Sequence, residues 1–507
     1  MTQSRIYGPA TGVPLGQVEP LLLPWAKDPW DRLRPPLSVE AMRLSAELAG
    51  ATYRMAVEPW MRAGWQDVTI HVDGELTSLQ EGEHWLSARW KKYRVRSRIR
   101  QNNPVSQVLG ALRQRSGSST GKAVVMIHPA SHGRYVVAVS FMGTGTRFYD
   151  WFSNFRMTTL DGVHKGFHQL TRQFEQNEER IEFPSTAREL GLEKLTLAHI
   201  LRDMKSPNSR FLLWLSGHSQ GGAVMQVYAH RKIMEDGVLP VNVVGYGFAS
   251  PSVMTGDAVA QPEAYPLFHV HNSDDLFPRC GAAVHLGMCL TYPSDEGLRR
   301  SCYNWPRDEE SVKARLAVRP IIRQMKDTPS CIVQVLAYLK ILEGYSVQEI
   351  AQVLGIGDTL PLEHVLEGAD VKGLVQHISR RAAGAYRSIT GAPLKETAAQ
   401  EAVQRMQMVM DELGLRRFTE ALVQLMRCPH SISARRDGRF CSAYVYIVRC
   451  GVTQLIPGIW QSGQPPVKLI AKRRAQEEAR GAALRLPACR MLRKKPYLRV
   501  RTLTTGK

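Results

Sequence analysis

Cysteine is scarce in this chain, with eight residues among 507, all between Cys280 and Cys489. Small secreted proteins that depend on disulfides carry a denser and more regular set, so no disulfide framework is expected. One group of zinc-binding side chains stands out: Cys428, His430, Cys441 and Cys450. Its spacing contains no CxxC pair, the usual mark of a structural zinc site. We therefore expect reduced, buried thiols, with no bound metal and no cofactor.

Long hydrophobic runs are also missing. No stretch of about 18 apolar residues occurs, the length that a helix needs to cross a bilayer, so no transmembrane helix is expected. The first thirty residues lack a basic start, and prolines interrupt their short apolar stretch, which argues against a secretory signal. The expected location is the cytoplasm, with membrane association or export without a signal left open.

Acidic residues are too few to balance the basic ones, and the formal net charge is +20. The excess is concentrated at the C-terminus, where residues 468–507 contain 13 Lys or Arg against Glu477 and Glu478. Such a tail is attracted to polyanions. An anionic membrane surface is the partner that we expect, and nucleic acid is not.

Between residues 38 and 298, short apolar runs alternate with helical patterns. The predicted strands are Val68–Val72, Ala123–His128, Tyr135–Phe141, Phe211–Leu215, Val241–Phe248 and Leu267–His271. The predicted helices are Ser38–Met61, Phe167–Gln176, Leu195–Met204 and Gly222–Met234. This alternation is typical of an α/β fold with a mostly parallel central sheet. From Glu309 to Met426 the pattern is almost wholly helical, and Tyr444–Val448 is a further predicted strand.

The motif that carries chemistry is Gly217-His218-Ser219-Gln220-Gly221. It follows an apolar strand and opens a helix, which is the setting of a nucleophile elbow. Small residues at Gly217 and Gly221 allow the strand and the helix to approach closely at the turn. Ser219 would then stand at a helix N-terminus, where the helix dipole and free N–H groups favour developing negative charge. The motif predicts that Ser219 is a nucleophile.

Several segments, in order along the chain, resemble the class 3 lipase family of the α/β-hydrolase fold. They are Phe141-Met142-Gly143-Thr144 with Asp150-Trp151, Val163-His164-Lys165-Gly166-Phe167, Gly217 to Gly222, Gly247 to Pro251, and Asp274 to Pro278. The resemblance covers roughly residues 40–295. Met142, Ala249 and Gln220 stand where the family more often has arginine, glycine and leucine, and none of the three replaces a reacting group. The resemblance implies a hydrolase of lipid-like esters.

Acyl transfer also needs donors to the oxyanion and a carboxylate that orients the base. The backbone N–H of Gln220, which follows the nucleophile, is one expected donor. The resemblance implies Thr144 as the second. Asp275 lies on a loop after a strand, at the sheet edge where sites form in α/β folds, and the D-x-x-P register favours it over Asp274.

Four histidines follow Asp275 and compete for the role of base: His285, His364, His377 and His430. We favour His430, because Pro429 predicts a loop at the end of the helical region and because Cys428 to Ile432 resembles the family's H-S stretch. His285 is interpreted as structural, and His364 and His377 as helix positions. His164 and His218 are expected to pack or hydrogen-bond, since His164 precedes the nucleophile strand and His218 adjoins Ser219.

These assignments divide the chain into five parts. They are an N-terminal extension (1–37), a lipase-like core (38–298), a helical insertion or second domain placed where it could act as a lid (299–426), a return to the core (427–463) and a basic tail (464–507). The predicted function is a serine ester hydrolase, either triacylglycerol lipase or phospholipase-like.

Two other classes of protein remain as alternatives. A hydrolase fold that binds lipid without catalysis differs from an enzyme only in whether Ser219 reacts. Residues 342–356 resemble a helix-turn-helix, which with the basic tail would suit a DNA-binding protein. A capping box of Ser346 and Glu349, with Gly355 ending the helix, explains that segment without DNA.

Overall fold

A computed structural model describes residues 6–22, 38–80, 83, 121–143, 159–256, 258–259, 262, 265–280, 284–303, 305–327, 396–432 and 442–458. Some residues singled out in the sequence lie outside this part of the chain: Thr144, Asp150, Trp151, His364, His377, the helix-turn-helix-like segment 342–356 and the basic tail.

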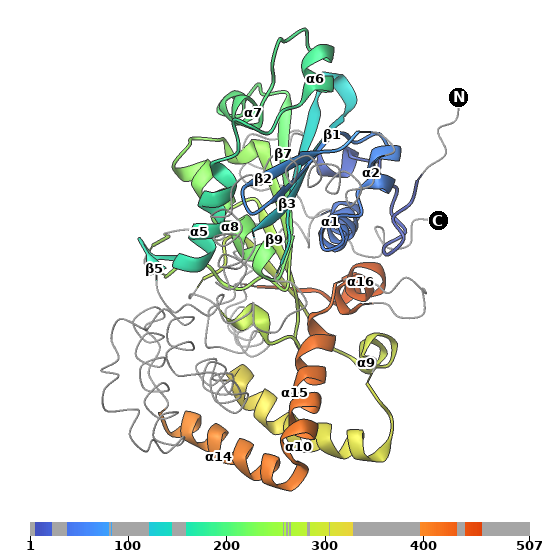
Figure 1. The fold of residues 1–507 in the computed structure, drawn as a ribbon, viewed down its shortest axis with the longest axis vertical. Helices are drawn as coiled ribbons and strands as arrows, with labels where there is room; N and C mark the ends of the chain where they lie inside the picture. The colour runs from blue at the N-terminus through green and yellow to red at the C-terminus, as the bar shows by residue number, and fades with distance from the viewer. Residues whose placement is uncertain are drawn as a thin grey trace, which may run out of the picture.

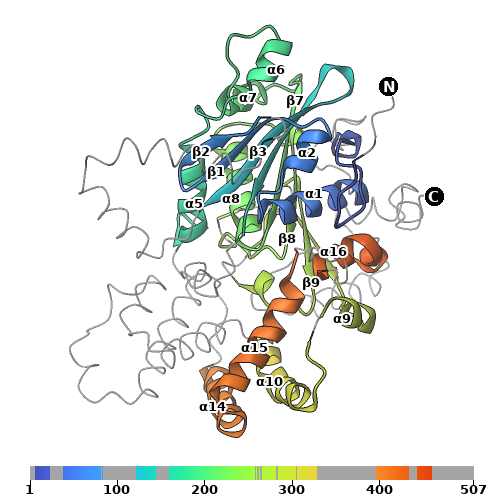
Figure 2. The same cartoon turned by 45° about the vertical axis from the view of Figure 1, so that its right-hand side comes forward.

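The described residues form a central nine-stranded sheet with the order β11-β10-β9-β8-β7-β4-β3-β1-β2 (Figures 1 and 2). The strands are β1 (Gln66–Val72), β2 (Glu75–Ser78), β3 (Lys122–Pro129), β4 (Tyr135–Phe141), β7 (Phe211–His218), β8 (Val243–Phe248), β9 (Leu267–Asn272), β10 (Met288–Tyr292) and β11 (Ile456–Gly458). Neighbours from β4 through β10 are parallel, and both edges of the sheet are antiparallel. A separate short hairpin joins β5 (Thr159–Leu160) and β6 (Val163–His164). The mostly parallel sheet agrees with the predicted fold class.

Helices cover both faces of the sheet, so its central strands are apolar on both sides. Every residue of β4, β7, β8 and β9 is buried. One face packs against α1 (Val39–Thr52) and α16 (Ala443–Tyr446). The other packs against α5 (Lys165–Glu175), α7 (Leu197–Asp203) and α8 (Gln220–Met234). The short helices α2 (Glu58–Arg62) and α6 (Pro184–Glu189) lie near the β1 edge of the molecule (Figure 1).

A helical region extends from the end of the sheet at which β9 finishes (Figure 1). It contains α9 (Glu296–Cys302), α10 (Glu309–Asp327), α14 (Glu396–Leu413) and α15 (Leu415–His430). Helix α15 packs against α10 and α14 and then reaches α16. The expected boundary at residue 426 therefore lies inside α15, and a single helix joins the helical region to the core.

Two local predictions near the C-terminus were wrong. His430 is the last residue of α15, with Pro429 inside the final turn, rather than part of a loop. Proline disfavours a helix because it lacks an N–H donor and its ring crowds the preceding turn, and the hydrogen bonds of Asn272 with Pro429 and of Asp275 with His430 offset this cost. Tyr444–Val448 forms α16 and a π-helical turn instead of a strand. Tyr444, Val445, Ile447 and Val448 are buried in packing against α1 and β9, and this packing overrides their strand propensity.

The expected N-terminal extension includes a segment that packs against the core. Leu15 and Leu21 are fully buried. The backbone N–H groups of Ala10 and Thr11 donate to the carboxylate of Glu47 in α1 at 2.7–3.3 Å. Within the described residues, no helix is long and apolar enough to cross a membrane.

Candidate active site

Ser219 stands at the sharp turn between β7 and α8, as the N-cap residue of that helix. Its backbone angles are φ 56° and ψ −129°, a region that L-residues rarely adopt and that costs on the order of 1–3 kcal/mol. The Ser219 N–H donates to the carbonyl of Phe248 at 2.8 Å, which anchors the turn to β8. The side chain is 6% exposed. The strain and the position are those of a nucleophile elbow.

Three glycines make this turn sterically feasible. A Cβ at Gly217 would overlap the backbone of Gly221, and a Cβ at Gly221 would overlap the carbonyl of Phe141 in β4. A Cβ at Gly222 would overlap the hydroxyl of Ser250. Gly217 and Gly221 are therefore required by close backbone approach between β4, β7 and α8, and Gly222 is required by the Ser250 side chain in the loop after β8.

Asp275 and His430, which are 155 positions apart, form a hydrogen-bonded pair. Their Oδ2 and Nδ1 atoms are 2.8 Å apart, and both side chains are buried. Because a carboxylate only accepts hydrogen bonds, Nδ1 carries the proton of the imidazole, and Nε2 is left as the basic nitrogen. This is the orientation that a carboxylate imposes on a catalytic histidine.

Further contacts hold the carboxylate and the histidine in place. The Tyr444 hydroxyl donates to Asp275 Oδ2 at 2.8 Å, and the backbone N–H of Phe277 donates to Oδ1 at 3.0 Å. The Phe277 ring packs on His430 with centroids 4.3 Å apart. Asn272 donates to the carbonyl of Pro429, the residue before His430, at 3.0 Å. The end of β9 and the loop that follows it thus hold both members of the pair in place.

His218 links the nucleophile turn to the histidine. Its Nε2 lies 2.7 Å from the carbonyl oxygen of His430, and its Nδ1 lies 2.6 Å from the hydroxyl of Tyr53 in α1. Since a carbonyl can only accept, Nε2–H donates and Nδ1 accepts from Tyr53. Burial, together with the nearby His430, holds the pKa of His218 well below its usual range. His218 is therefore a neutral hydrogen-bonding residue, in the role that its sequence position predicted.

His164 and His285, which the sequence analysis interpreted as non-catalytic, make packing and hydrogen-bonding contacts. His164 caps α5, and its ring stacks on Phe167 with centroids 4.0 Å apart. His285 is buried, with Nε2 2.8 Å from the carbonyl of Ser250. Asp274, the rival of Asp275, forms an ion pair with Arg299 at 2.9 Å.

The expected oxyanion donors lie at the start of α8 and beside it. Gln220 is the first residue of α8 and is 3% exposed. Gly143 ends the described segment that follows β4, and a Cβ placed on it would lie 3.1 Å from Ser219 Cβ. The backbone immediately before Thr144 therefore runs against Ser219. Any larger residue at Gly143 would also overlap the His218 carbonyl.

Sequence reasoning missed Tyr53, Asn272 and Tyr444, which support the pair and His218. No motif marks them, because each acts through a contact between elements distant in sequence. Among the described residues, no group of three His, Cys, Asp or Glu side chains is arranged to hold a metal ion. Cys441, a member of the zinc-like set, lies outside the described residues.

Four buried histidines predict a loss of stability in mild acid. Burial lowers the pKa of His269 to about 3 and that of His71 to about 4, and it holds the pKa values of His271 and His218 well below their usual range. Below about pH 6.5 the unfolded chain protonates at these positions while the folded chain does not, so each histidine costs about 1.4 kcal/mol per pH unit.

Urea unfolding at pH 8, 7, 6 and 5 measures this effect. We expect a nearly constant midpoint between pH 8 and 7 and a falling midpoint below pH 6.5. His269→Gln, which keeps an N–H donor for the Leu286 carbonyl, should flatten the fall. A midpoint as high at pH 5 as at pH 7 would contradict the prediction.

Residues 138–285 match the sequence model of the family "Lipase (class 3)". This segment of the chain is class 3 lipase-like. The lipase-like segment contains Ser219 and Asp275, whereas His430 lies beyond it. The match to the family model confirms the family resemblance and, with the sheet described above, the α/β-hydrolase fold. The matched segment is shorter than the stretch from about residue 40 to residue 295 over which the sequence resembles the family.

Solved structures similar to the chain include fungal lipases. A Rhizomucor miehei lipase propeptide complex has 19% identity over 34% of this chain and 53% of its own, with a TM-score of 0.25. The lipase of Rhizopus microsporus var. chinensis has 16% identity over 35% and 58%, with a TM-score of 0.26. Lipase II from Rhizopus niveus has 18% identity over 35% and 63%, with a TM-score of 0.25.

The chain thus spans less than two thirds of the length of these lipases. No curated protein matches it significantly.

Proposed function

We propose that the chain is a serine ester hydrolase acting on a lipid-like carboxylic ester through Ser219, Asp275 and His430. The observation that carries this proposal is the 2.8 Å hydrogen bond between Asp275 and His430, buried close to the strained turn that bears Ser219. The hydrogen bond from His218 to the His430 carbonyl joins the two parts, because His218 is the neighbour of Ser219 in the chain.

The proposed reaction has two steps. His430 Nε2 takes the proton from Ser219 Oγ as that oxygen attacks the ester carbonyl, and the proton then passes to the leaving alcohol, so that an acyl-enzyme remains. Water attacks the acyl-enzyme with the same base, and the acid is released with Ser219 restored. The backbone N–H of Gln220 and a donor from Thr144 would stabilise the oxyanion in both steps.

Labelling by a fluorophosphonate probe tests the nucleophile. The wild-type chain should be labelled at Ser219, as mapped by mass spectrometry of its peptides, and Ser219→Ala should not be labelled. This experiment also separates the enzyme from a hydrolase fold that only binds lipid. Unchanged labelling of Ser219→Ala, or no labelling of a folded wild-type chain, would contradict the proposal.

The lipid nature of the ester rests on the class 3 lipase-like segment. Triacylglycerol and phospholipid both fit it, and a panel of the two, presented as emulsions and as vesicles, would distinguish a lipase from a phospholipase. The basic tail from residue 468 supports a further proposal from charge alone, that the chain works at an anionic membrane surface from the cytoplasmic side.

Tyr444 should act as a positioning residue for Asp275. Tyr444→Phe removes the hydroxyl that donates to Oδ2, and a hydrogen bond to a charged group is worth about 1.5–3 kcal/mol. We expect kcat on a soluble ester to fall about tenfold or somewhat more, with KM nearly unchanged. Tyr446→Phe, two residues away and with its ring packed against Tyr292 at a centroid distance of 6.5 Å, is the control. Equal rates for both variants would remove Tyr444 from the site.

A further inference from the structure

The candidate base His430 is the last residue of helix α15, so the end of this helix carries it to Asp275. The last four carbonyl groups of an α-helix have no partner within the helix. In α15, the Pro429 carbonyl accepts a hydrogen bond from Asn272 Nδ2 at 3.0 Å. The His430 carbonyl accepts one from His218 Nε2 at 2.7 Å. Two side chains of the core therefore cap the helix that bears the base.

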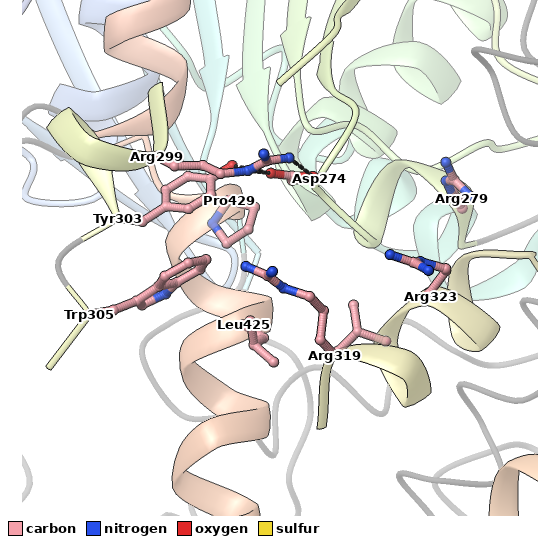
Figure 3. Close-up of a pocket in the computed structure, with 10 residues that line it drawn as sticks. Asp274, Arg279, Arg299, Tyr303, Trp305, Arg319, Arg323, Leu425 and Pro429 are labelled. Carbon is pink, nitrogen blue, oxygen red and sulfur yellow. Dashed lines mark hydrogen bonds and ion pairs between the residues drawn. The ribbon is translucent and has the colours of Figure 1, made fainter. Parts of the chain in front are cut away.

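Asn272, at the end of β9, is a rigid anchor for Pro429 because its side chain is fully buried and hydrogen-bonded. Its amide nitrogen also donates to the Tyr303 hydroxyl at 2.9 Å, and its Oδ1 accepts from the backbone N–H of Asp274 at 3.1 Å. Figure 3 shows Pro429 close to Tyr303 and Asp274, and these three residues line one cavity. The amide of Asn272 is thus held at both its oxygen and its nitrogen, so the Pro429 carbonyl has a fixed donor.

His218 is the second anchor, and Tyr53 sets which of its nitrogens donates. A neutral imidazole carries one proton, on either Nδ1 or Nε2. The Tyr53 hydroxyl lies 2.6 Å from Nδ1 and donates to it, so Nε2 keeps the proton and donates to the His430 carbonyl. In the other tautomer, a lone pair of Nε2 would face the carbonyl oxygen, and two acceptors repel each other. Tyr53 therefore selects the form of His218 that can bind the end of α15.

We propose that His218, held in this tautomer by Tyr53, is a positioning residue for His430. The inference rests on the proposed function, because it takes His430 as the base. Both nitrogens of His218 are engaged, one with the hydroxyl of Tyr53 and the other with the helix end, so His218 takes no proton from Ser219. Its ring also packs on the ring of His430, with centroids 4.6 Å apart. His218 thus acts on the reaction only through the position of His430.

The anchors matter because Asp275 alone does not fix the basic nitrogen. A histidine side chain has two rotatable bonds, so Nε2 has a single position only when the backbone and Nδ1 are both held. Asp275 holds Nδ1, and the two helix-end carbonyls hold the backbone through Asn272 and His218. If His218 no longer held the backbone, Nε2 could shift while Nδ1 stayed on Asp275. A shift of about 1 Å at a reacting group can cost about 100-fold in rate.

The kinetic test compares two substitutions of His218 in the full chain. His218→Phe keeps an aromatic ring but has no N–H for the His430 carbonyl, whereas the amide of His218→Gln can still donate to it. We expect kcat on a soluble ester to fall about 10- to 100-fold in His218→Phe with KM nearly unchanged, because the base is displaced and the substrate is not. His218→Gln should recover most of this loss. Tyr53→Phe, which only frees the tautomer, should lower kcat by about tenfold or less.

Proton NMR without substrate measures the position of the base independently of the chemistry. An Nδ1–H that donates to a carboxylate resonates at low field, and the signal of His430 is assigned by its loss in Asp275→Asn. We expect this signal to be broadened or lost in His218→Phe and retained in His218→Gln. A wild-type chain with the signal but without esterase activity would contradict the proposed function alone, and the signals of the variants would still decide the inference.

Tyr265→Phe is the matched control for Tyr53→Phe. The Tyr265 hydroxyl lies 2.6 Å from His230 Nδ1, and this pair joins α8 to the segment before β9 instead of holding the end of α15. The variant loses the same kind of hydrogen bond, so it should keep kcat within about twofold and retain the NMR signal.

Urea unfolding shows whether each variant is folded. A folded His218→Phe with the kcat and the NMR signal of wild type would overturn the inference. Equal losses in His218→Phe and His218→Gln would also overturn it, because the N–H donor would then not be the cause. If His218→Phe does not fold, Tyr53→Phe decides by the same two measurements. A lower kcat with a broadened signal would then support the inference, and wild-type values would overturn it.

Discussion

Ser219→Ala should lower kcat/KM for a soluble short-chain ester by on the order of 10⁴- to 10⁶-fold, since the residue that attacks the carbonyl is lost. The residual rate would come from binding and the oxyanion donors alone. The measurement is the initial rate of p-nitrophenyl butyrate hydrolysis at equal protein concentrations. Activity within tenfold of wild type would rule out Ser219 as the nucleophile.

Ser219→Gly separates the loss of chemistry from the loss of structure. Glycine accepts the positive φ of residue 219 without strain, so this variant should be as inactive as Ser219→Ala but more stable, by about 1 kcal/mol. A urea titration checks the stability of both variants. If the glycine variant were less stable than the alanine variant, the backbone strain inferred at the elbow would be wrong.

Asp275→Asn should reduce kcat by on the order of 10³- to 10⁴-fold, with a small change in KM. The amide is neutral and can donate its own N–H to His430 Nδ1, so the imidazole loses the tautomer and the charge compensation that the base needs. The side chain keeps its size in a fully buried position, which limits changes in packing. Steady-state kinetics on the same ester gives the two parameters.

Asp274→Asn is the matched control for this variant. It changes the neighbouring residue in the same way but affects an ion pair with Arg299, away from the hydrogen bond to His430. We expect it to retain kcat within a few fold, because partly exposed ion pairs contribute about 1 kcal/mol or less. A large loss from Asp274→Asn and a small one from Asp275→Asn would reverse the assignment made from the D-x-x-P register.

Much of the architecture follows from local sequence. The strands β4, β7, β8 and β9 are short apolar runs. Such runs are typical of strands in a parallel sheet, because helices cover both faces of the sheet and bury every side chain. The turn at Ser219 is marked by a local motif, because Gly217, Gly221 and Gly222 lie within three residues of it, although β4 and the loop after β8 impose the requirement on Gly221 and Gly222. The observed bounds of these four strands and of α8 differ from the predicted bounds by a few residues at most.

The helical region shows where local reasoning fails. Pro429 predicts a loop, yet it lies in the last turn of α15, where hydrogen bonds to Asn272 and Asp275 hold this end of the helix. Residues 444–448 have the composition of a strand, but the sheet already has β10 and β11 at that edge, and the segment buries the same side chains as a helix against α1. For residues 444–448 packing outweighs a strand propensity of about 1 kcal/mol per residue, and for Pro429 tertiary contacts outweigh a helix cost of up to about 3 kcal/mol.

The sequence by itself determined the fold class, six of the nine sheet strands and the position of the nucleophile turn, because these follow from hydrophobic period and from the local G-x-S-x-G motif. Only the tertiary structure selected, among the histidines it describes, the one that meets Asp275, since that contact joins residues 155 positions apart through α15. It also decided the roles of Tyr53, Asn272 and Tyr444, which contact His218, Pro429 and Asp275. Such contacts arise from the packing of distant elements, and no spacing along the chain encodes them.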